Sequence, residues 1–276
     1  MWSGLAGSCS TEHTDLQTPS NMLGHSSAAT TVLLIVIPTL LLLQDTSALK
    51  AGDFFKVCRR SDPKLNDCIK DTINALRPAL KKGISELKIS SAEPMKVPKV
   101  QVFQGTGPVS IDSVFTDLTI QGITQYEVKS ASADVDKYRV DFEVALPWMY
   151  ITGNYNISGQ ILVLPIRGDG DSWSNYTGVT GKASLNGHPE TRNGKVYMEL
   201  DEFKFEIKVD HATIMMNNLF NGNKELGDAM NKFMSDNWEA VFAELKPVVD
   251  QAISAILKDV AQKVFKKFPY EELFPK

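Results

Sequence analysis

The sequence predicts an α+β fold in which a long C-terminal α-helix is wrapped by an antiparallel β-sheet. Apolar residues recur every three or four positions in the last fifth of the chain, at 226–268, and every second position in its middle. At ~1.5 Å per residue, the helical segment would be roughly 64 Å long if straight. Because two adjacent apolar residues occur at most turns, the helix needs neighbours on more than one side.

Residues 1–48 have the features of a secretory signal region. The run 32–43 is 12 apolar residues long, which suits the ~7–15-residue core of a signal peptide and falls short of the ~20 residues of a membrane span. Small residues follow, and we expect cleavage near Ala48. No Lys or Arg precedes the run, and Met22 is an alternative start. An uncleaved anchor is the other interpretation.

Residues 49–276 are expected to form a single domain with one cysteine pair. Cys9 lies in the signal region, which leaves Cys58 and Cys68. An even pair in a secreted chain indicates a disulfide, which would contribute ~2–3 kcal/mol. The wide spacing of the two residues does not fit a C-x-x-C metal or redox motif.

Two N-glycosylation sequons fit the same secretory route: N-I-S at Asn156 and N-Y-T at Asn175. Asn156 alternates with apolar neighbours and is therefore expected on a polar face. Asn175 shares the parity of Val179 and Leu185. That parity would place Asn175 on the apolar face, so its glycosylation is expected if it precedes the strand proper.

The first helix is predicted to begin at Ser61-Asp62-Pro63, because a capping residue comes just before a Pro at the first helical position. The apolar residues that follow share one helical face. They are Leu65, Cys68, Ile69, Ile73 and Leu76. Cys68 is therefore expected on the buried side of this helix.

The segment from about 87 to 209 predicts a long antiparallel meander, polar outside and apolar inside, because apolar and polar residues alternate there. Turn signals separate the predicted strands. They lie at 105–108, at Pro147, at 167–171 (R-G-D-G-D) and at 186–189.

Two local irregularities are predicted. The apolar parity of 196–209 switches near 201–202, which indicates a β-bulge or a bend there. Pro247 interrupts the C-terminal helical pattern, and a proline inside a helix costs ~3 kcal/mol. We expect either one bent helix or two helices, 226–245 and 248–268, that differ in direction.

Composition and motifs argue against several functions. Residues 50–276 hold 29 basic and 30 acidic residues without a basic block, so a nucleic-acid partner has no electrostatic support. The sequence lacks a G-x-S-x-G elbow, an H-E-x-x-H motif, a Cys/His cluster and an EF-hand. We therefore expect no catalytic residue, metal or cofactor. His188 is expected in a solvated loop, His211 in a cap or surface position, and the R-G-D at 167–169 in a polar turn.

Three segments resemble the insect takeout and juvenile-hormone-binding-protein family. They are CRRSDPKLNDCI around the cysteine pair, GNYNISGQILVLPIRGDGDSW, and LFNGNKELGDAMNKFMSDNWEAVFAELKP at 219–247. The ending P-Y-E-E-L-F at 269–274 is also similar. The resemblance covers roughly 52–275, almost the whole predicted mature chain.

The resemblance implies a secreted carrier of small lipophilic molecules. The implied fold is tubular lipid-binding (TULIP-like), with a highly curved antiparallel sheet around the helix and an internal apolar tunnel. The implied ligand is terpenoid, juvenile-hormone-like or fatty-acid-like, and the location is haemolymph or another extracellular fluid. Family members are linked to circadian, feeding and courtship physiology. Hormone binders carry a second disulfide, so a single cysteine pair is closer to the takeout branch.

Nine apolar residues are candidate ligand contacts. Aromatic residues at helical spacing are typical of plain core, and it is the resemblance that favours a tunnel lining. A ligand burying ~12–15 carbons would gain ~10–12 kcal/mol, of which association costs several. The candidates are Phe142, Val144, Trp148, Ile161, Phe203, Phe205, Phe233, Trp238 and Phe242.

Three alternatives to the carrier have different requirements. A secreted lipid-acting enzyme would need a nucleophile or metal motif. A solid-core signalling or structural protein would need no ligand. A lipocalin-type barrel would not place so long an amphipathic helix at the C-terminus. The sequence predicts no stable membrane span and identifies no protein receptor.

Overall fold

Two very long antiparallel strands, β4 (Arg139–Ile161) and β5 (Leu164–Arg192), form the centre of the fold. The structure is a computed structural model that describes residues 49–105 and 107–276, which belong to one unit. The predicted signal region, with Met22, Cys9 and the run 32–43, lies outside the described residues.

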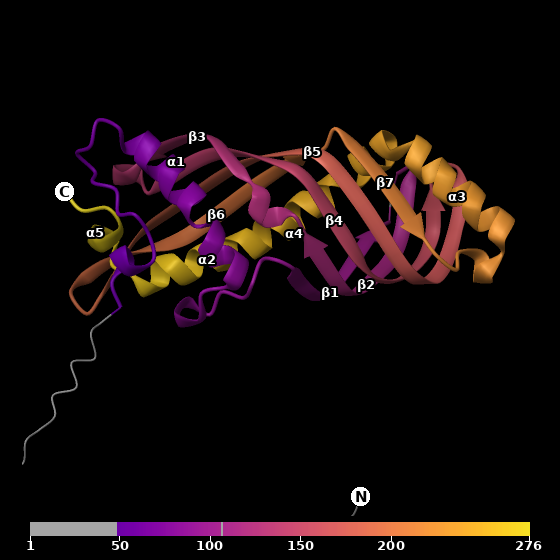
Figure 1. Cartoon of the computed structure of the whole chain (residues 1–276), viewed down its shortest axis with the longest axis horizontal. Helices are drawn as coiled ribbons and strands as arrows, with labels where there is room; N and C mark the ends of the chain where they lie inside the picture. Colours follow the sequence, from indigo (N-terminus) through magenta and orange to yellow (C-terminus); the bar gives the residue numbers. More distant parts are fainter. Residues whose placement is uncertain (1–48, 106) are drawn as a thin grey trace, which may run out of the picture. The chain divides into compact units, whose positions relative to one another are not determined.

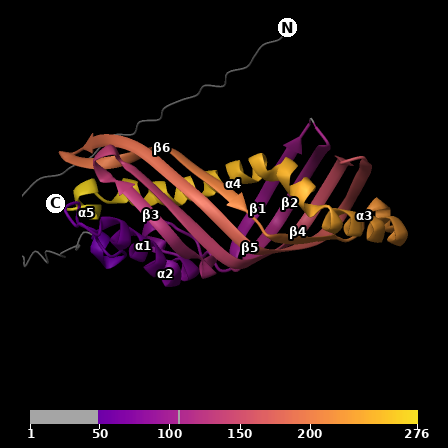
Figure 2. The same cartoon turned by 90° about the horizontal axis from the view of Figure 1, so that it is seen from above.

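The other strands pair with one end or the other of β4 and β5, which divides the sheet into two halves (Figures 1 and 2). Half-sheet A contains β3 (Glu127–Asp134), β4 residues 139–146, β5 residues 179–192 and β6 (Lys195–Lys208). Half-sheet B contains β1 (Met95–Gln104), β2 (Val109–Gln121), β4 residues 148–161, β5 residues 164–177 and β7 (His211–Met216). The antiparallel sheet is confirmed, but it is not a simple meander, because β2 pairs with β4 rather than with β3, and β7 pairs with β5 rather than with β6.

The α-helices precede and follow the strands of the sheet. The α-helices are α1 (Leu65–Ala75), α2 (Arg77–Lys82), α3 (Lys224–Asp236), α4 (Trp238–Lys267) and α5 (Tyr270–Leu273). Short 3-10 helices are η1 (Ala51–Asp53), η2 (Ser85–Leu87), η3 (Ile123–Gln125), η4 (Val135–Lys137) and η5 (Phe220–Gly222). The helix α4 lies along β6 and reaches β7 and β2, while α1 lies along β3 and α3 along β7.

The two half-sheets meet at Pro147 of β4 and Gly178 of β5, which are absent from the paired register. Proline has no N–H to donate, and Gly178 has φ 59°, in the left-handed region. In a regular strand, the residues that face the core are an even number of positions apart. Tyr176 and Val179 of β5 both pack in the same core cluster although they are three residues apart, so the alternation between the two faces shifts by one residue at Gly178. Pro147 therefore marks the join of the half-sheets rather than the predicted turn.

The predictions of turns at 167–171 and 186–189 are also wrong, because β5 continues through both segments. The predicted turn at 105–108 does lie between β1 and β2. The β5–β6 turn is at Asn193 and Gly194, whose φ angles of 50° and 74° match a type I′ hairpin.

The predicted β-bulge is confirmed. Asn186 of β5 pairs with Glu202 of β6, while the next residue, Gly187, pairs with Leu200. Asp201 is thus the extra residue on β6.

The C-terminal helical segment divides at Asn237, not at Pro247. Asn237 separates α3 from α4, and its side-chain amide donates to the Phe233 carbonyl at 2.8 Å. Pro247 lies inside α4. The carbonyl four residues before it, on Ala243, loses its helical partner, but both residues are exposed, so water can replace the missing bond.

Apolar side chains form three core clusters. Cluster A lies under half-sheet A with α1 and most of α4, cluster B under half-sheet B with α3, and a third joins the segment around Ala51 to Phe268. The disulfide between Cys58 and Cys68 is present, and Cys68 is buried in α1 as predicted. This helix begins at Leu65, two residues after Pro63.

Among the helices that the structure describes, none combines the length and the apolar character needed to cross a membrane.

Candidate functional site

The helix α4 turns one row of apolar side chains toward half-sheet A. These residues, spaced four apart, pack against cluster A, and we call them the inner row of α4. They are Val249, Ile253, Leu257, Ala261 and Phe265. Every member is half-buried rather than buried, although all lie against the core.

The sheet presents alternating small and aromatic residues to the same space. One inward row crosses half-sheet A through Ala131, Phe142, Ala183 and Phe205. The Phe142 ring meets the Phe203 ring edge to face, with 6.4 Å between centroids. Phe142 is half-buried, as are the inward-facing Leu146 and Met149 nearer the join.

The inner row of α4 therefore keeps accessible apolar surface although it packs against cluster A. All residues of α4 are described, and of these Val241 alone is fully buried. Protein interiors are normally close-packed, so a long apolar helix lying against a sheet is expected to bury many of its side chains completely. On the sheet, Phe142, Leu146 and Met149 are likewise half-buried, whereas Ala183 and Phe205 are buried.

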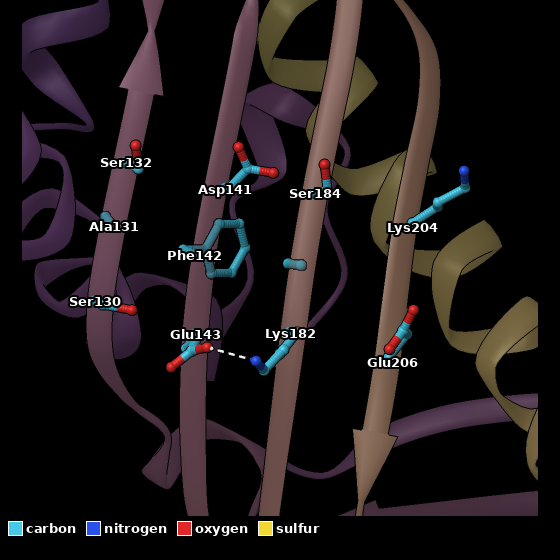
Figure 3. Close-up of a pocket in the computed structure, with 11 residues that line it drawn as sticks. Ser130, Ala131, Ser132, Asp141, Phe142, Glu143, Lys182, Ser184, Lys204 and Glu206 are labelled. Atoms are coloured by element: carbon cyan, nitrogen blue, oxygen red, sulfur yellow. Dashed lines mark ion pairs between the residues drawn. The ribbon is translucent and has the colours of Figure 1, made fainter.

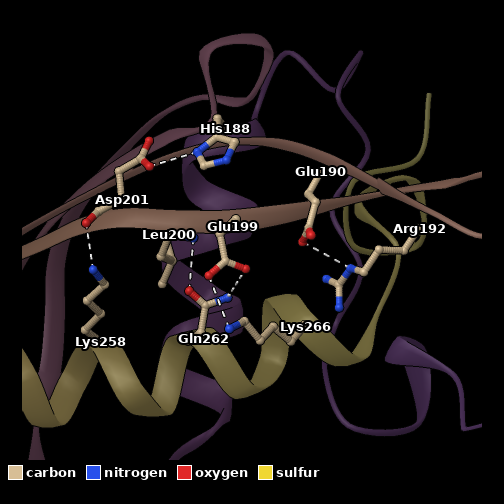
Figure 4. A network of polar contacts seen from close by, with 9 residues as sticks. All are labelled: His188, Glu190, Arg192, Glu199, Leu200, Asp201, Lys258, Gln262 and Lys266. Carbon is tan, nitrogen blue, oxygen red and sulfur yellow. Dashed lines mark hydrogen bonds and ion pairs between the residues drawn. The ribbon is translucent and has the colours of Figure 1, made fainter.

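A second row on α4, one residue further along at each turn, forms hydrogen bonds with the free edge of β6, and Figure 4 shows two of its members, Lys258 and Gln262. We call Asp250, Ser254, Lys258 and Gln262 the polar row of α4. Three of them accept hydrogen bonds from backbone N–H groups of β6: Asp250 from Ile207 at 2.9 Å, Ser254 from Phe205 at 2.9 Å and Gln262 from Leu200 at 3.0 Å. The fourth, Lys258, donates to the Asp201 carbonyl at 2.6 Å.

Side chains around the β-bulge strengthen this attachment. Glu199 of β6 lies 3.2 Å from the Lys266 ammonium and accepts from the Gln262 amide at 3.4 Å. His188 Nδ1 lies 2.8 Å from Asp201 Oδ1 on the exposed face. Because the polar row holds α4 at the strand edge, the adjacent inner row is directed over the sheet.

Two other edge strands are covered by helices in the same way. In α1, Asn66 accepts from the Ala133 N–H of β3 at 3.0 Å. In α3, the buried Asn231 both accepts from the Met216 N–H and donates to the Met216 carbonyl of β7, each at 2.9 Å. These contacts satisfy edge groups that would otherwise be free to pair with another chain.

The nine predicted ligand contacts are divided among different places. Phe142, Val144, Phe203, Phe205 and Phe242 lie in or against cluster A, and Ile161 and Phe233 in or against cluster B. Trp148 is misplaced by the prediction, because the parity change at Pro147 turns it to the outer face, where its ring lies over Gly122. Trp238 lies outside the three clusters, with its ring centroid 5.9 Å from that of His211.

The sequence reasoning missed polar groups on the inner face at the join. Burial raises the pKa of the Tyr176 hydroxyl, and a hydrogen bond with Ser174 partly opposes that shift. Tyr176 packs against cluster A, and Ser174 pairs with the inward-facing Ile214 of β7. Their hydroxyls therefore lie in mostly apolar surroundings.

The outer face of half-sheet A is polar. An open hollow of about 340 Å³ lies there (Figure 3), and most of the residues around it carry charges or hydroxyls. Glu143 and Lys182 form an ion pair of 3.1 Å across β4 and β5. A second open hollow, of about 700 Å³, lies at the join beside Arg77 and Asp210. Neither lining suits an apolar ligand.

The remaining predicted residues lie on the surface or near it. His188 is exposed, but it lies in β5 and not in a loop, and His211 is exposed at the start of β7. Asn156 is exposed on the outer face of β4, as predicted. Asn175 also lies on the outer face and is half-buried, which corrects the parity argument from Val179.

Comparisons with known proteins place the sequence among similar chains. The family model described as haemolymph juvenile hormone binding protein (JHBP) matches residues 32–275. The "Circadian clock-controlled protein daywake" of Drosophila melanogaster is 24% identical over 229 residues, 80% of this chain and 87% of that protein. A "Putative beta-carotene-binding protein" of Schistocerca gregaria is 22% identical over 218 residues, 78% of this chain and 86% of that protein.

The crystal structure of Epiphyas postvittana Takeout 1 has the same fold. It superposes with a TM-score of 0.69 at 22% sequence identity, covering 80% of this chain and 99% of that one.

Proposed function

The chain belongs to the takeout and haemolymph juvenile hormone binding protein family, and we propose that it is a secreted carrier of a small lipophilic molecule. The ligand lies between the inner row of α4 and the inward face of half-sheet A. Release into haemolymph or another extracellular fluid follows from the predicted signal region. A carrier needs no catalytic group, and the proposal assigns none.

The single observation that carries this proposal is the half-burial of the inner row. Five apolar side chains lie against cluster A, yet each keeps accessible surface. Covering that surface with a ligand removes it from water, which is worth roughly 25 cal/mol per Å². Binding of this kind needs no ionic contact, and apolar pockets with few polar groups are typical of small-molecule sites.

An isoprenoid or a fatty acid is the ligand class that the chemistry favours. The interior surfaces are aliphatic and aromatic, and the β-carotene for which the Schistocerca gregaria relative is named is an isoprenoid. The hydroxyls of Tyr176 and Ser174 would meet an oxygen at one end of such a molecule. A clock-linked role is supported by the name of the daywake relative alone.

Organic extraction of the secreted protein tests the proposal. The full chain is expressed in insect cells, purified from the medium, extracted with solvent and compared by mass spectrometry with an unrelated secreted protein from the same cells. We expect one lipophilic compound class enriched in near-stoichiometric amount. An extract that matches the control, together with failure to take up a fluorescent fatty acid, would contradict the proposal.

A further inference from the structure

Aromatic side chains surround the second sequon on the outer face of the sheet. The sequence from Trp173 to Thr177 is W-S-N-Y-T. In a β-strand, residues two apart lie on one face, so Trp173, Asn175 and Thr177 share a face of β5. Their neighbour Tyr176 points the other way, into the core.

The neighbouring strand adds a second ring. Tyr150 of β4 pairs directly with Asn175, and directly opposed side chains have Cβ atoms ~4.5–5.5 Å apart. The centroids of the Tyr150 and Trp173 rings are 6.2 Å apart, with their planes at 35°. On the other side, Thr213 of β7 pairs with Asn175. Asn175 thus lies beside two aromatic rings.

These rings remain partly accessible, although they are large and apolar. Tyr150, Trp173 and Asn175 are each half-buried. The irregularity at Gly178 produces this arrangement. Asn175 and Val179 are four residues apart and would share a face in a regular strand, but Asn175 points outward and Val179 points inward. A group attached to the Asn175 amide would lie over the rings.

We propose that Asn175 is N-glycosylated and that the first sugar of the glycan packs on the rings of Trp173 and Tyr150. This inference rests on the secretory route of the proposed function. The face of an aromatic ring is electron-rich, and the C–H groups of an N-acetylglucosamine present a weakly positive apolar face to it. The contact removes ring surface from water and so stabilises the folded chain.

The other sequon provides an internal comparison. Asn156 is exposed on the outer face of half-sheet B. Its same-face neighbours along β4 are Asn154 and Ser158, and its cross-strand neighbours are Val114 and Asp169. A glycan on Asn156 meets small or polar side chains there and extends into solvent.

The test measures occupancy and stability together in protein secreted from insect cells. Glycopeptide mapping reports occupancy, and thermal unfolding compares Asn175→Gln and Asn156→Gln with the unchanged chain. We expect Asn175→Gln to lower Tm by about 2–4 °C, the effect of a modest stabilising contact in a domain of this size. Asn156→Gln is expected to leave Tm unchanged.

A thermodynamic cycle identifies the rings as the partner of the sugar. Enzymatic deglycosylation is expected to lower Tm in the unchanged chain and to lower it less in Trp173→Leu and in Tyr150→Ser, each of which removes one of the two rings. An equal shift in all three proteins would overturn the inference. So would an unmodified Asn175 in protein that is secreted and binds lipid, a result that leaves the proposed function intact.

Discussion

Replacing Ser254 with alanine should measurably destabilise the fold, because it removes one contact between α4 and β6. The Ser254 hydroxyl accepts from the Phe205 N–H at 2.9 Å and donates to the Asp250 carbonyl at 2.6 Å. Phe205 is only 9% exposed, so its N–H has little access to water when the hydroxyl is gone. The alanine variant therefore leaves a buried donor without an acceptor.

Two effects of opposite sign set the size of the change. An unsatisfied buried donor costs about 1–3 kcal/mol, and alanine gains about 0.5 kcal/mol over serine in helix propensity. The net destabilisation is about 0.5–2.5 kcal/mol. At about 2–4 °C per kcal/mol for a domain of this size, Tm falls by roughly 1–10 °C.

Urea unfolding followed by tryptophan fluorescence, with calorimetry for Tm, measures the effect. Gln251→Ala is the matched control, because Gln251 is exposed on the same helix almost one turn earlier. That substitution should change the free energy of unfolding by less than about 0.5 kcal/mol. If Ser254→Ala is as stable as Gln251→Ala, the polar row does not fasten α4 to the sheet.

Two further predictions concern α1. Replacing Cys58 and Cys68 with serine should cost about 2–3 kcal/mol, because the disulfide closes a short loop; an unchanged Tm would contradict this. Burial raises the pKa of Tyr126 from 10.0 to about 12, and its hydroxyl donates to the Ile73 carbonyl at 2.6 Å. The stability from this raised pKa is complete below pH 10 and is lost as the pH rises toward 12. Tyr126→Phe should therefore lose less stability across that window, and a loss equal to that of the unchanged chain would refute the assignment.

The long helical segment and the antiparallel sheet were predictable because their periods are set by local geometry. The apolar spacing at 226–268 requires helix, and alternation requires half-buried strand. The bulge at Asp201 was predictable for the same reason, because one extra residue shifts the alternation of apolar and polar side chains in the rest of the strand.

The parity changes at Pro147 and Gly178 were not predictable by the same reasoning. Alternation assigns each side chain to the correct face of the sheet as long as the strand stays regular. A single residue in the left-handed conformation, such as Gly178, moves every later side chain to the opposite face. Regular alternation therefore predicts Trp148 and Asn175 on the inner face, whereas both lie on the outer face. Pro147 predicts a turn by the same reasoning, and nothing in the alternating pattern marks Gly178.

The polar row was missed although a signal was present. Asp250, Ser254, Lys258 and Gln262 recur every four residues, which places them on one side of the helix. Their partners are backbone groups of β6, which no side-chain pattern identifies. The division at Asn237 was missed because Pro247 is the stronger local signal, yet its exposure makes the proline tolerable inside α4.

Ligand uptake by tryptophan variants of α4 tests most directly whether a lipid occupies the space between this helix and the sheet. Ala261→Trp adds bulk to the inner row, whereas Ala255→Trp adds the same bulk at an exposed position. Delipidated proteins are titrated with a fluorescent fatty acid, and their folding is checked by thermal unfolding. We predict uptake by the unchanged chain and by Ala255→Trp, and a loss of at least tenfold in affinity, about 1.4 kcal/mol, for Ala261→Trp. Equal uptake by both variants, or none by the unchanged chain, would contradict the proposed site.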